Sequence, residues 1–226
     1  MPHLKNTFPV IGIVFLGLLA CNKKDGENQH LNPDDQTTFD LMSVKEGSTW
    51  RYGGRDGVTY TRYARGKDTI KLDARYSYYE RKDDNAGSFD PEYFGKNKDA
   101  YLTLVDVDGN QDNYLNYLFW KDGATVGTSW DNTGKVNAPT IGRVNVLVES
   151  YVAEDNLTMM LSSQTFTRVV HVHSDLKGGP FNTRLGNLDI WLVKDIGILR
   201  EEVHIDVLGQ YQLDHTDSLL DYHIVP

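Results

Sequence analysis

The sequence predicts an all-β protein, built as a curved antiparallel meander or half-barrel with at most one or two short helices. After residue 38 the chain is rich in Tyr, Val, Thr and Trp, with Gly, Asn and Asp at intervals, which is typical of strands and turns. Apolar and polar residues alternate over several short segments, so each strand has one buried and one wet face. About ten such strands imply a curved or closed sheet.

The alternation is clearest in residues 69–79, 143–153 and 198–207. In the first of these segments, one face carries Ile70, Leu72, Ala74, Tyr76 and Tyr78. Further strands are expected at 48–52, 58–65, 100–106, 114–120, 164–173, 188–194 and 219–225. The best candidate for a short helix is 38–44, with Phe39 and Met42 on one side.

Turn residues separate these strands. They are Gly53-Gly54 with Asp56-Gly57, then 66–68, 108–110 and 195–197. In the last turn we expect a positive φ at Gly197, because the β-branched Ile196 is badly suited to that conformation.

Residues 1–20 are typical of a secretion signal. Lys5 gives a positive start, and the apolar stretch from Phe8 to Leu19 is shorter than the ~20 residues that a membrane-spanning helix needs. We therefore expect three parts: a signal peptide at 1–20, a flexible polar tether at 21–38 and one antiparallel β domain at 39–226. The tether has one strongly apolar residue, Leu31, and cannot bury enough surface to fold.

Leu18-Leu19-Ala20-Cys21 resembles the lipobox of bacterial lipoproteins, Leu-x-Ala-Cys. The resemblance implies cleavage after Ala20 and acylation of Cys21, with palmitate among the acyl chains. Each buried methylene then contributes about 0.8 kcal/mol to anchoring. A plain signal peptide that ends by chance at the chain's single cysteine is the alternative. The resemblance predicts a lipid-anchored protein of the outer membrane, on either its periplasmic or its surface face.

The charge of the chain excludes some partners. Without the signal, 22 basic and 32 acidic residues give a formal charge of −10. Nucleic acid is therefore not an expected partner, because phosphate contacts need dense Lys and Arg. Attraction to anionic lipid is not expected either. The expected membrane contact is the acyl chains on Cys21.

Two segments extend the resemblance. Residues 41–52 end in Gly-x-x-Trp-x-Tyr, and residues 190–202 place an aromatic strand before Gly-Ile-Leu-Arg-Glu-Glu. Both resemble lipoproteins of Bacteroidota that are similar to TapB-like and LolA-type half-barrels. The resemblance implies a curved sheet that can wrap an apolar ligand, and it supplies no catalytic residues. Trp191 stands where Tyr or Phe is expected.

Aromatic side chains are the main candidates for contact with such a ligand. Large apolar pockets with few polar groups bind ligands on the concave side of a sheet. The candidates are Tyr76, Tyr78, Tyr117, Phe119, Trp120 and Trp191. The alternative is that these residues form only the core.

Metal sites are weaker candidates. His171 and His173 are two apart on an expected strand and face one way, a spacing that suits zinc, with His204 or Glu202 as a third ligand. A polar strand face explains the pair without a metal. The acidic segment 106–112 has the oxygen density of a calcium loop but not its order, so a hairpin turn is preferred. We expect no metal or other cofactor.

Catalytic motifs are missing from the sequence. It contains no Gly-x-Ser-x-Gly, phosphate loop or dinucleotide fingerprint, and Glu201-Glu202 point to opposite faces of a strand. Asp68-Thr69-Ile70 and Asp217-Ser218-Leu219 resemble the O-glycosylation acceptor of Bacteroidota. The leading hypothesis is a non-enzymatic envelope lipoprotein that binds or carries an apolar ligand or lipid. The alternative is a structural or protein-interaction lipoprotein without a small ligand.

Overall fold

The computed structural model describes residues 36–54, 57–85, 87–106, 114–138, 142–179, 182–207 and 211–226. In these ranges every regular element is a strand. The strands are β1 (Gln36–Thr37), β2 (Thr49–Gly54), β3 (Thr59–Lys71), β4 (Ala74–Asp83), β5 (Asp90–Asn97), β6 (Ala100–Asp106), β7 (Tyr114–Lys121), β8 (Ser129–Ala138), β9 (Gly142–Leu161), β10 (Gln164–Gly178), β11 (Thr183–Val193), β12 (Gly197–Val207) and β13 (Tyr211–His223). The predicted all-β class is confirmed.

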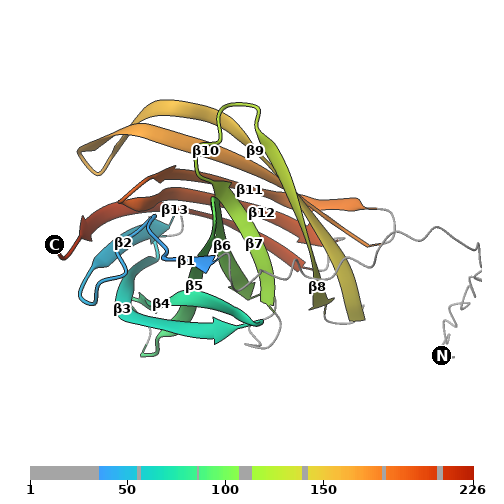
Figure 1. The fold of residues 1–226 in the computed structure, drawn as a ribbon, viewed down its shortest axis with the longest axis horizontal. Helices are drawn as coiled ribbons and strands as arrows, with labels where there is room; N and C mark the ends of the chain where they lie inside the picture. Colours follow the sequence, from blue (N-terminus) through green and yellow to red (C-terminus); the bar gives the residue numbers. More distant parts are fainter. Residues whose placement is uncertain are drawn as a thin grey trace, which may run out of the picture.

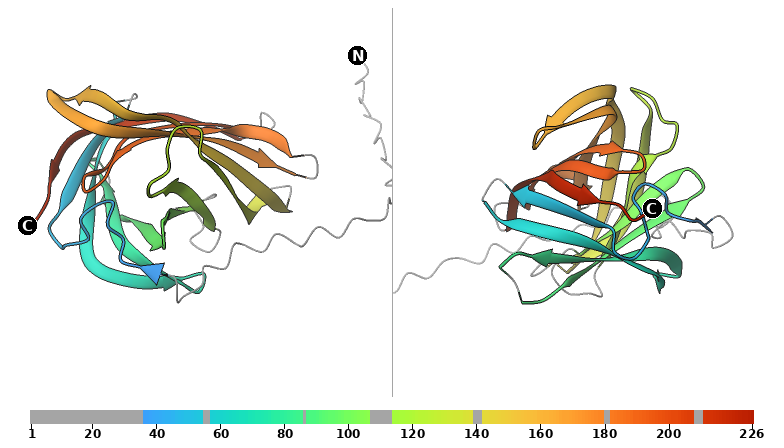
Figure 2. Two further views of the ribbon diagram at one scale, coloured as in Figure 1. Left: turned by 45° about the horizontal axis from the view of Figure 1, so that its top comes forward. Right: turned by 90° about the vertical axis from the view of Figure 1, so that its left-hand side faces the viewer.

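Twelve strands form one continuous antiparallel sheet in the order β7-β6-β5-β4-β3-β2-β13-β12-β11-β10-β9-β8 (Figure 1). The short β1 pairs with β5 through Gln36–Asn97 and Thr37–Lys96, so the last residues of the predicted tether belong to the sheet. In the left view of Figure 2 the sheet bends round on itself, and its green strands lie across the curve from its red and orange strands. The result is a nearly closed barrel.

The two ends of the sheet meet without a backbone ladder. The side-chain amide of Asn132 on β8 donates to the carbonyl oxygen of Asn116 at 2.7 Å and accepts from the N–H of Leu118 at 3.3 Å. The indole of Trp130 donates to the carbonyl oxygen of Leu118 at 3.0 Å. The Asn132 amide thus acts as a peptide group would in a ladder, and it satisfies edge groups of β7 that are otherwise costly to bury.

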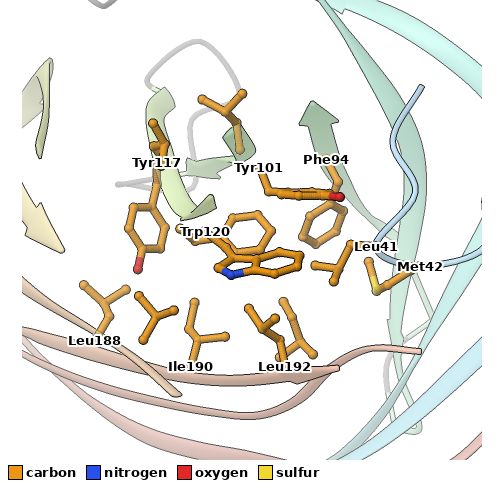
Figure 3. Close-up of a cluster of buried hydrophobic side chains, with 14 of the residues drawn as sticks. Leu41, Met42, Phe94, Tyr101, Tyr117, Trp120, Leu188, Ile190 and Leu192 are labelled. Atoms are coloured by element: carbon orange, nitrogen blue, oxygen red, sulfur yellow. The ribbon is translucent and has the colours of Figure 1, made fainter. Parts of the chain in front are cut away.

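Aromatic side chains from one wall meet aliphatic side chains from the other in the barrel interior (Figure 3). Phe94, Tyr101 and Trp120 come from β5 to β7, and Ile190 and Leu192 come from β11; all five are at most 5% exposed. This packing removes a large apolar area from water, at roughly 25 cal/mol per Å².

The expected helix at 38–44 is wrong. These residues are irregular, and they lie against the barrel as a plug. Phe39 and Met42 are buried, as is Leu41 between them. Phe39 packs on the rings of Tyr79, Phe94 and Tyr101 at centroid distances of 5.7–6.3 Å. An irregular backbone allows all three apolar side chains to be buried at one site, and this burial outweighs the local preference for a helix.

The expected strand 69–79 is also wrong, because it contains a two-residue hairpin turn. Leu72 and Asp73 both have positive φ, at 48° and 60°, and Lys71 pairs with Ala74 across the turn. Both φ values are positive, as in the turns favoured between twisted strands. Leucine is unusual in this conformation, so no local pattern indicated the turn. Ile70 and Leu72 are consequently exposed, at 65% and 45%.

Two further differences concern β3 and the missed strands. The expected turn at 66–68 is a bulge inside β3, with Gly66 at φ 62° and a register shift between Ala64 and Asp68. β5 and β8 were not expected. The segments 143–153 and 198–207 lie within β9 and β12, with Val146, Val148 and Val152 buried as the alternation predicts.

The turn at 195–197 is confirmed. Val193 pairs with Gly197, and Gly197 has a positive φ of 110°. A Cβ at this position would lie 2.6 Å from the sulfur of Met42. Glycine is therefore required at this position for two reasons: it tolerates the positive φ of the turn, and it leaves space for the Met42 side chain of the plug.

Candidate functional site

Four of the six predicted ligand-facing aromatics are buried core residues, three of them on β7 and the fourth, Tyr76, on β4. Tyr117, Phe119 and Trp120 are between 0% and 5% exposed. Trp120 stacks on Tyr101 at 4.7 Å. The hydroxyl groups of Tyr117, Ser174 and Ser150 form a buried chain, with oxygen distances of 2.7 and 2.8 Å. Tyr117 and Trp120 thus lie among the side chains that fill the barrel interior (Figure 3).

Tyr76 and Tyr78 share one face of β4, but it is the face opposite to the core residue Tyr79. Tyr78 packs on Tyr93 at 5.8 Å, and its hydroxyl donates to Glu80 at 2.8 Å. Tyr79 instead packs on Phe39 and the other rings of the plug region. Tyr76 is fully buried, and its hydroxyl has no hydrogen-bond partner in the described part of the chain. Period-two alternation places the two sets of rings on opposite sides of the sheet.

Trp191 lies on the outer face of the barrel with the two histidines. Its ring stacks on His171 at 4.3 Å. His171 and His173 both bond to Oδ1 of Asp189 at 2.8 Å, so the two histidines do face one way. His204 lies apart from them, beside Asp214 at 2.9 Å, and Glu202 pairs with Arg200. No group of three or more acidic, His or Cys side chains in the described ranges could hold a metal ion.

The charges of this outer cluster are coupled. Burial alone would lower the pKa of His171, but hydrogen bonds to Asp189 and Glu154 outweigh it and raise the pKa above 6.5. Burial alone would raise the pKa of Asp189, but the hydrogen bonds from His171 and His173 lower it to about 2. Asp189 thus acts as the shared counter-ion of a polar strand face.

A polar pocket opens where β2 ends, and the sequence did not predict it. β2 stops at Gly54, opposite Asp217 of β13. The part of β13 before Asp217 pairs with β12 on one side and with no described strand on the other. A pocket of about 620 Å³ lies in this gap, lined by Val58, Tyr60, Arg81, Leu213, Asp214, His215, Thr216 and Asp217.

Two arginines near the pocket already have carboxylate partners. The Arg62 side chain is only 4% exposed and donates to both oxygens of Glu92, at 2.5 and 3.1 Å. Arg81 pairs with Asp83 at 2.9 Å and lies 3.8 Å from the centre of the Tyr60 ring. Each guanidinium is therefore neutralised within its own pair.

Glu201 and Asp217 lie directly opposite each other on β12 and β13. Their side chains share the inner face, because residues paired across two strands point the same way. Burial and the neighbouring Asp217 carboxylate raise the pKa of Glu201, although His215 and Arg62 act in the other direction. His215 itself is 3.9 Å from Asp217, at the limit of an ion pair.

This cluster was missed because its residues come from strands that are distant in the sequence. The one available signal was the alternation of β12, which places Glu201 on the same face as Leu199 and Val203. Glu202 is on the opposite face, as expected. Asp217 shows the same pattern on β13, since both it and Leu219 are buried.

Several predicted residues lie outside the described ranges, among them Ala20, Cys21 and residues 107–112 of the acidic loop. The two glycosylation candidates lie within strands. Thr69 pairs with Tyr76 near the β3–β4 turn, and Ser218 pairs with Arg200 in mid-sheet. In the part of the chain that the structure describes, no helix has the length and apolarity needed to cross a bilayer.

No protein-family model and no curated protein matches the chain. Two crystal structures share its fold. One is of a protein from Parabacteroides distasonis described as a lipoprotein, 10% identical, covering 83% of this chain and 100% of its own, with a TM-score of 0.50. The other is of a Bacteroides fragilis protein described as exported and with a YmcC-like fold, 13% identical, covering 82% and 99%, with a TM-score of 0.51. The chain thus has the fold of these proteins from Bacteroidota.

Proposed function

We propose that the chain is a lipid-anchored, non-enzymatic lipoprotein of the outer membrane whose barrel is an interaction module and not a carrier of an apolar ligand. The observation that carries this proposal is the filled interior. Trp120 and Phe119 on β7 are at most 5% exposed, as are Ile190 and Leu192 across the barrel. A carrier needs an empty apolar cavity, and protein interiors packed to this degree leave little room for a ligand.

The lipid anchor is supported by the N-terminal sequence. A short apolar stretch leads to Leu18-Leu19-Ala20-Cys21, and the thiol of Cys21 is the only one in the chain. One of the two proteins that share the fold is described as a lipoprotein and the other as exported. Several acyl chains on one residue hold a protein stably at a membrane.

The placement of Ser174 relative to the two histidines of its own strand supports a non-enzymatic role. A serine nucleophile needs an adjacent base, usually a histidine within hydrogen-bond distance. Ser174 points into the barrel, where it bonds to Tyr117 and Ser150. His171 and His173 are on the opposite face of the same strand and bond to Asp189. The strand therefore separates the hydroxyl groups from the imidazoles.

Two measurements test the proposal. Labelled palmitate should enter the wild-type chain and not the Cys21→Ala variant. Lipids extracted from the purified Cys21→Ala chain, which carries no acyl chains of its own, should contain no species at one per protein by mass spectrometry. Absence of label in the wild type would refute the anchor, and a stoichiometric lipid in the variant would refute the filled barrel.

A further inference from the structure

We propose that the turn of the β3–β4 hairpin is a second membrane contact, which places the exposed side chains of Ile70 and Leu72 against the bilayer that holds the acyl chains of Cys21. This inference rests on the lipid anchor proposed above, and it names the side of the barrel that faces the lipid. Seven large apolar side chains are exposed in the described ranges, and Ile70 and Leu72 are the two that lie together in one turn, at 65% and 45% exposure.

The described part of the chain enters the barrel beside this turn. β1 begins at Gln36, whose side-chain amide accepts from the backbone N–H of Arg75 at 2.8 Å and donates to the carbonyl oxygen of Arg75 at 3.4 Å. On its other side, Arg75 pairs with Ile70. Gln36, Arg75 and Ile70 therefore form one row, and in the left view of Figure 2 the blue β1 lies beside the cyan β3. The point where the N-terminal segment joins the barrel is thus fixed at this hairpin.

The length of chain before Gln36 keeps this side of the barrel near the lipid. Fifteen peptide bonds separate Cys21 from Gln36. A segment of this length spans at most about 50 Å when fully extended, and about 20 Å as the coil that its polar sequence predicts. The β9–β10 hairpin lies across the barrel from β1 (Figures 1 and 2). Of these two hairpins, β3–β4 is the one that an anchored chain presents to the bilayer.

The backbone conformation of Leu72 is an independent sign of a role outside folding. Its φ of 48° is rare for a bulky residue, and turns of this kind favour Asn or Gly. The Leu72 side chain gains little burial in return, because it is exposed to solvent. Strained residues of this kind are concentrated at functional sites. Burial of the side chain in lipid would offset the cost of the conformation.

The charges beside the turn fit a phospholipid surface. Residues 67–75 carry three cationic side chains and two carboxylates. Long cationic side chains such as Lys67 and Arg75, both exposed, can reach lipid phosphates while apolar neighbours enter the acyl boundary. The excess of positive charge is small, so burial of Ile70 and Leu72 is the main attraction.

Hydrogen exchange on protein coupled to vesicles tests this contact. The chain from Cys21 onward contains every described residue, and its single thiol couples to maleimide lipid in vesicles of phosphatidylethanolamine and phosphatidylglycerol. The same protein beside vesicles with quenched maleimide is the uncoupled reference. Coupling should slow exchange of the backbone amides at 71–75 at least about threefold, because lipid excludes water there, and it should leave the amides at 160–165 unchanged.

The double variant Ile70→Thr/Leu72→Asn removes the contact and keeps the fold. Threonine retains a β-branched side chain for the strand, and asparagine suits a positive φ, so this variant should be at least as stable as the wild type. It should lose the slowing at 71–75. Met160→Gln is the matched control, because Met160 is 76% exposed near the β9–β10 turn, and this variant should keep the slowing.

The coupling imposes the attachment chemically, so the result does not depend on acylation in the cell. Absence of palmitate label refutes the anchor, whereas absence of slowing in the coupled wild type refutes the hairpin contact. Equal slowing in the double variant, or at 160–165, would also overturn the contact. Slowing that grows with the surface density of the coupled chain would show contact between neighbouring copies instead of contact with lipid.

Discussion

Gly197 lies in the β11–β12 turn and packs against the plug formed by residues 38–44. Replacement of Gly197 by Ala tests both the turn conformation and this packing. The backbone at Gly197 has φ 110°, a conformation that costs a residue with a Cβ about 1–3 kcal/mol. The new Cβ would also lie 2.6 Å from the sulfur of Met42, which is 2% exposed and has little room to move. Overpacking of this kind costs a further ~1–3 kcal/mol. We therefore expect Gly197→Ala to lower the free energy of unfolding by about 2–6 kcal/mol, the sum of these terms.

Gly123→Ala is the matched control. Gly123 also has a positive φ, at 76°, but a Cβ there would meet nothing within 4 Å. It should therefore show the backbone cost alone. Urea denaturation followed by tryptophan fluorescence measures both variants, and unchanged m-values would show that stability alone has changed.

A double-mutant cycle isolates the contact with Met42. Met42→Ala removes the side chain that the new Cβ would strike, so the double variant should be more stable than the sum of the two single effects by about 1–3 kcal/mol. If Gly197→Ala costs no more than Gly123→Ala, or if the cycle is additive, the packing of the plug against this turn is refuted.

Two further predictions concern the seam and the outer histidines. Asn132→Ala should destabilise the protein by about 2–4 kcal/mol, because it leaves the carbonyl of Asn116 and the N–H of Leu118 buried without a partner. The control Thr133→Ala, on the outer face, should cost under about 0.5 kcal/mol. Equal costs for the two variants would show that the Asn132 amide does not close the barrel. Asp189→Asn should cost on the order of 2 kcal/mol between about pH 4 and 6.5, because the folded pKa of Asp189 is lowered to about 2 and that of His171 is raised. The Asp189 contribution is lost as the pH falls toward 2, and the His171 contribution is lost as the pH rises through its folded pKa. A cost independent of pH in urea denaturation would contradict this coupling.

The sequence by itself determined the class of the fold and most of its strands. Period-two alternation is a local property, so β9 and β12 could be located from residues such as Val146, Val148 and Val203. Gly197 could be placed at positive φ because the neighbouring Ile196 tolerates that conformation badly. The Leu-x-Ala-Cys pattern that ends at Cys21 is likewise local, and the acylation of Cys21 stays a prediction.

Only the tertiary structure decided which face of each strand is the inside. The alternation correctly predicted that Tyr76 and Tyr78 share one face of β4, but it could not show which face points into the barrel. The pairing of Tyr78 with Tyr93 places this face opposite to the one that carries Tyr79. The tertiary structure also decided that Leu72 lies in a hairpin turn. The pairing of β3 with β4, in which Lys71 pairs with Ala74, outweighs the cost of a positive φ at Leu72.

The polar pocket depends on contacts that no local pattern encodes. Tyr60 and Asp217 are far apart in the chain, and they line one pocket because β2 is shorter than its neighbours and β13 lies beside it. The pKa of Glu201 depends on Asp217, Arg62 and His215, which the pairing of β12, β13, β2 and β3 brings together. Long-range strand pairing sets such electrostatic environments, and for this reason the sequence indicated where the strands are but not what they enclose.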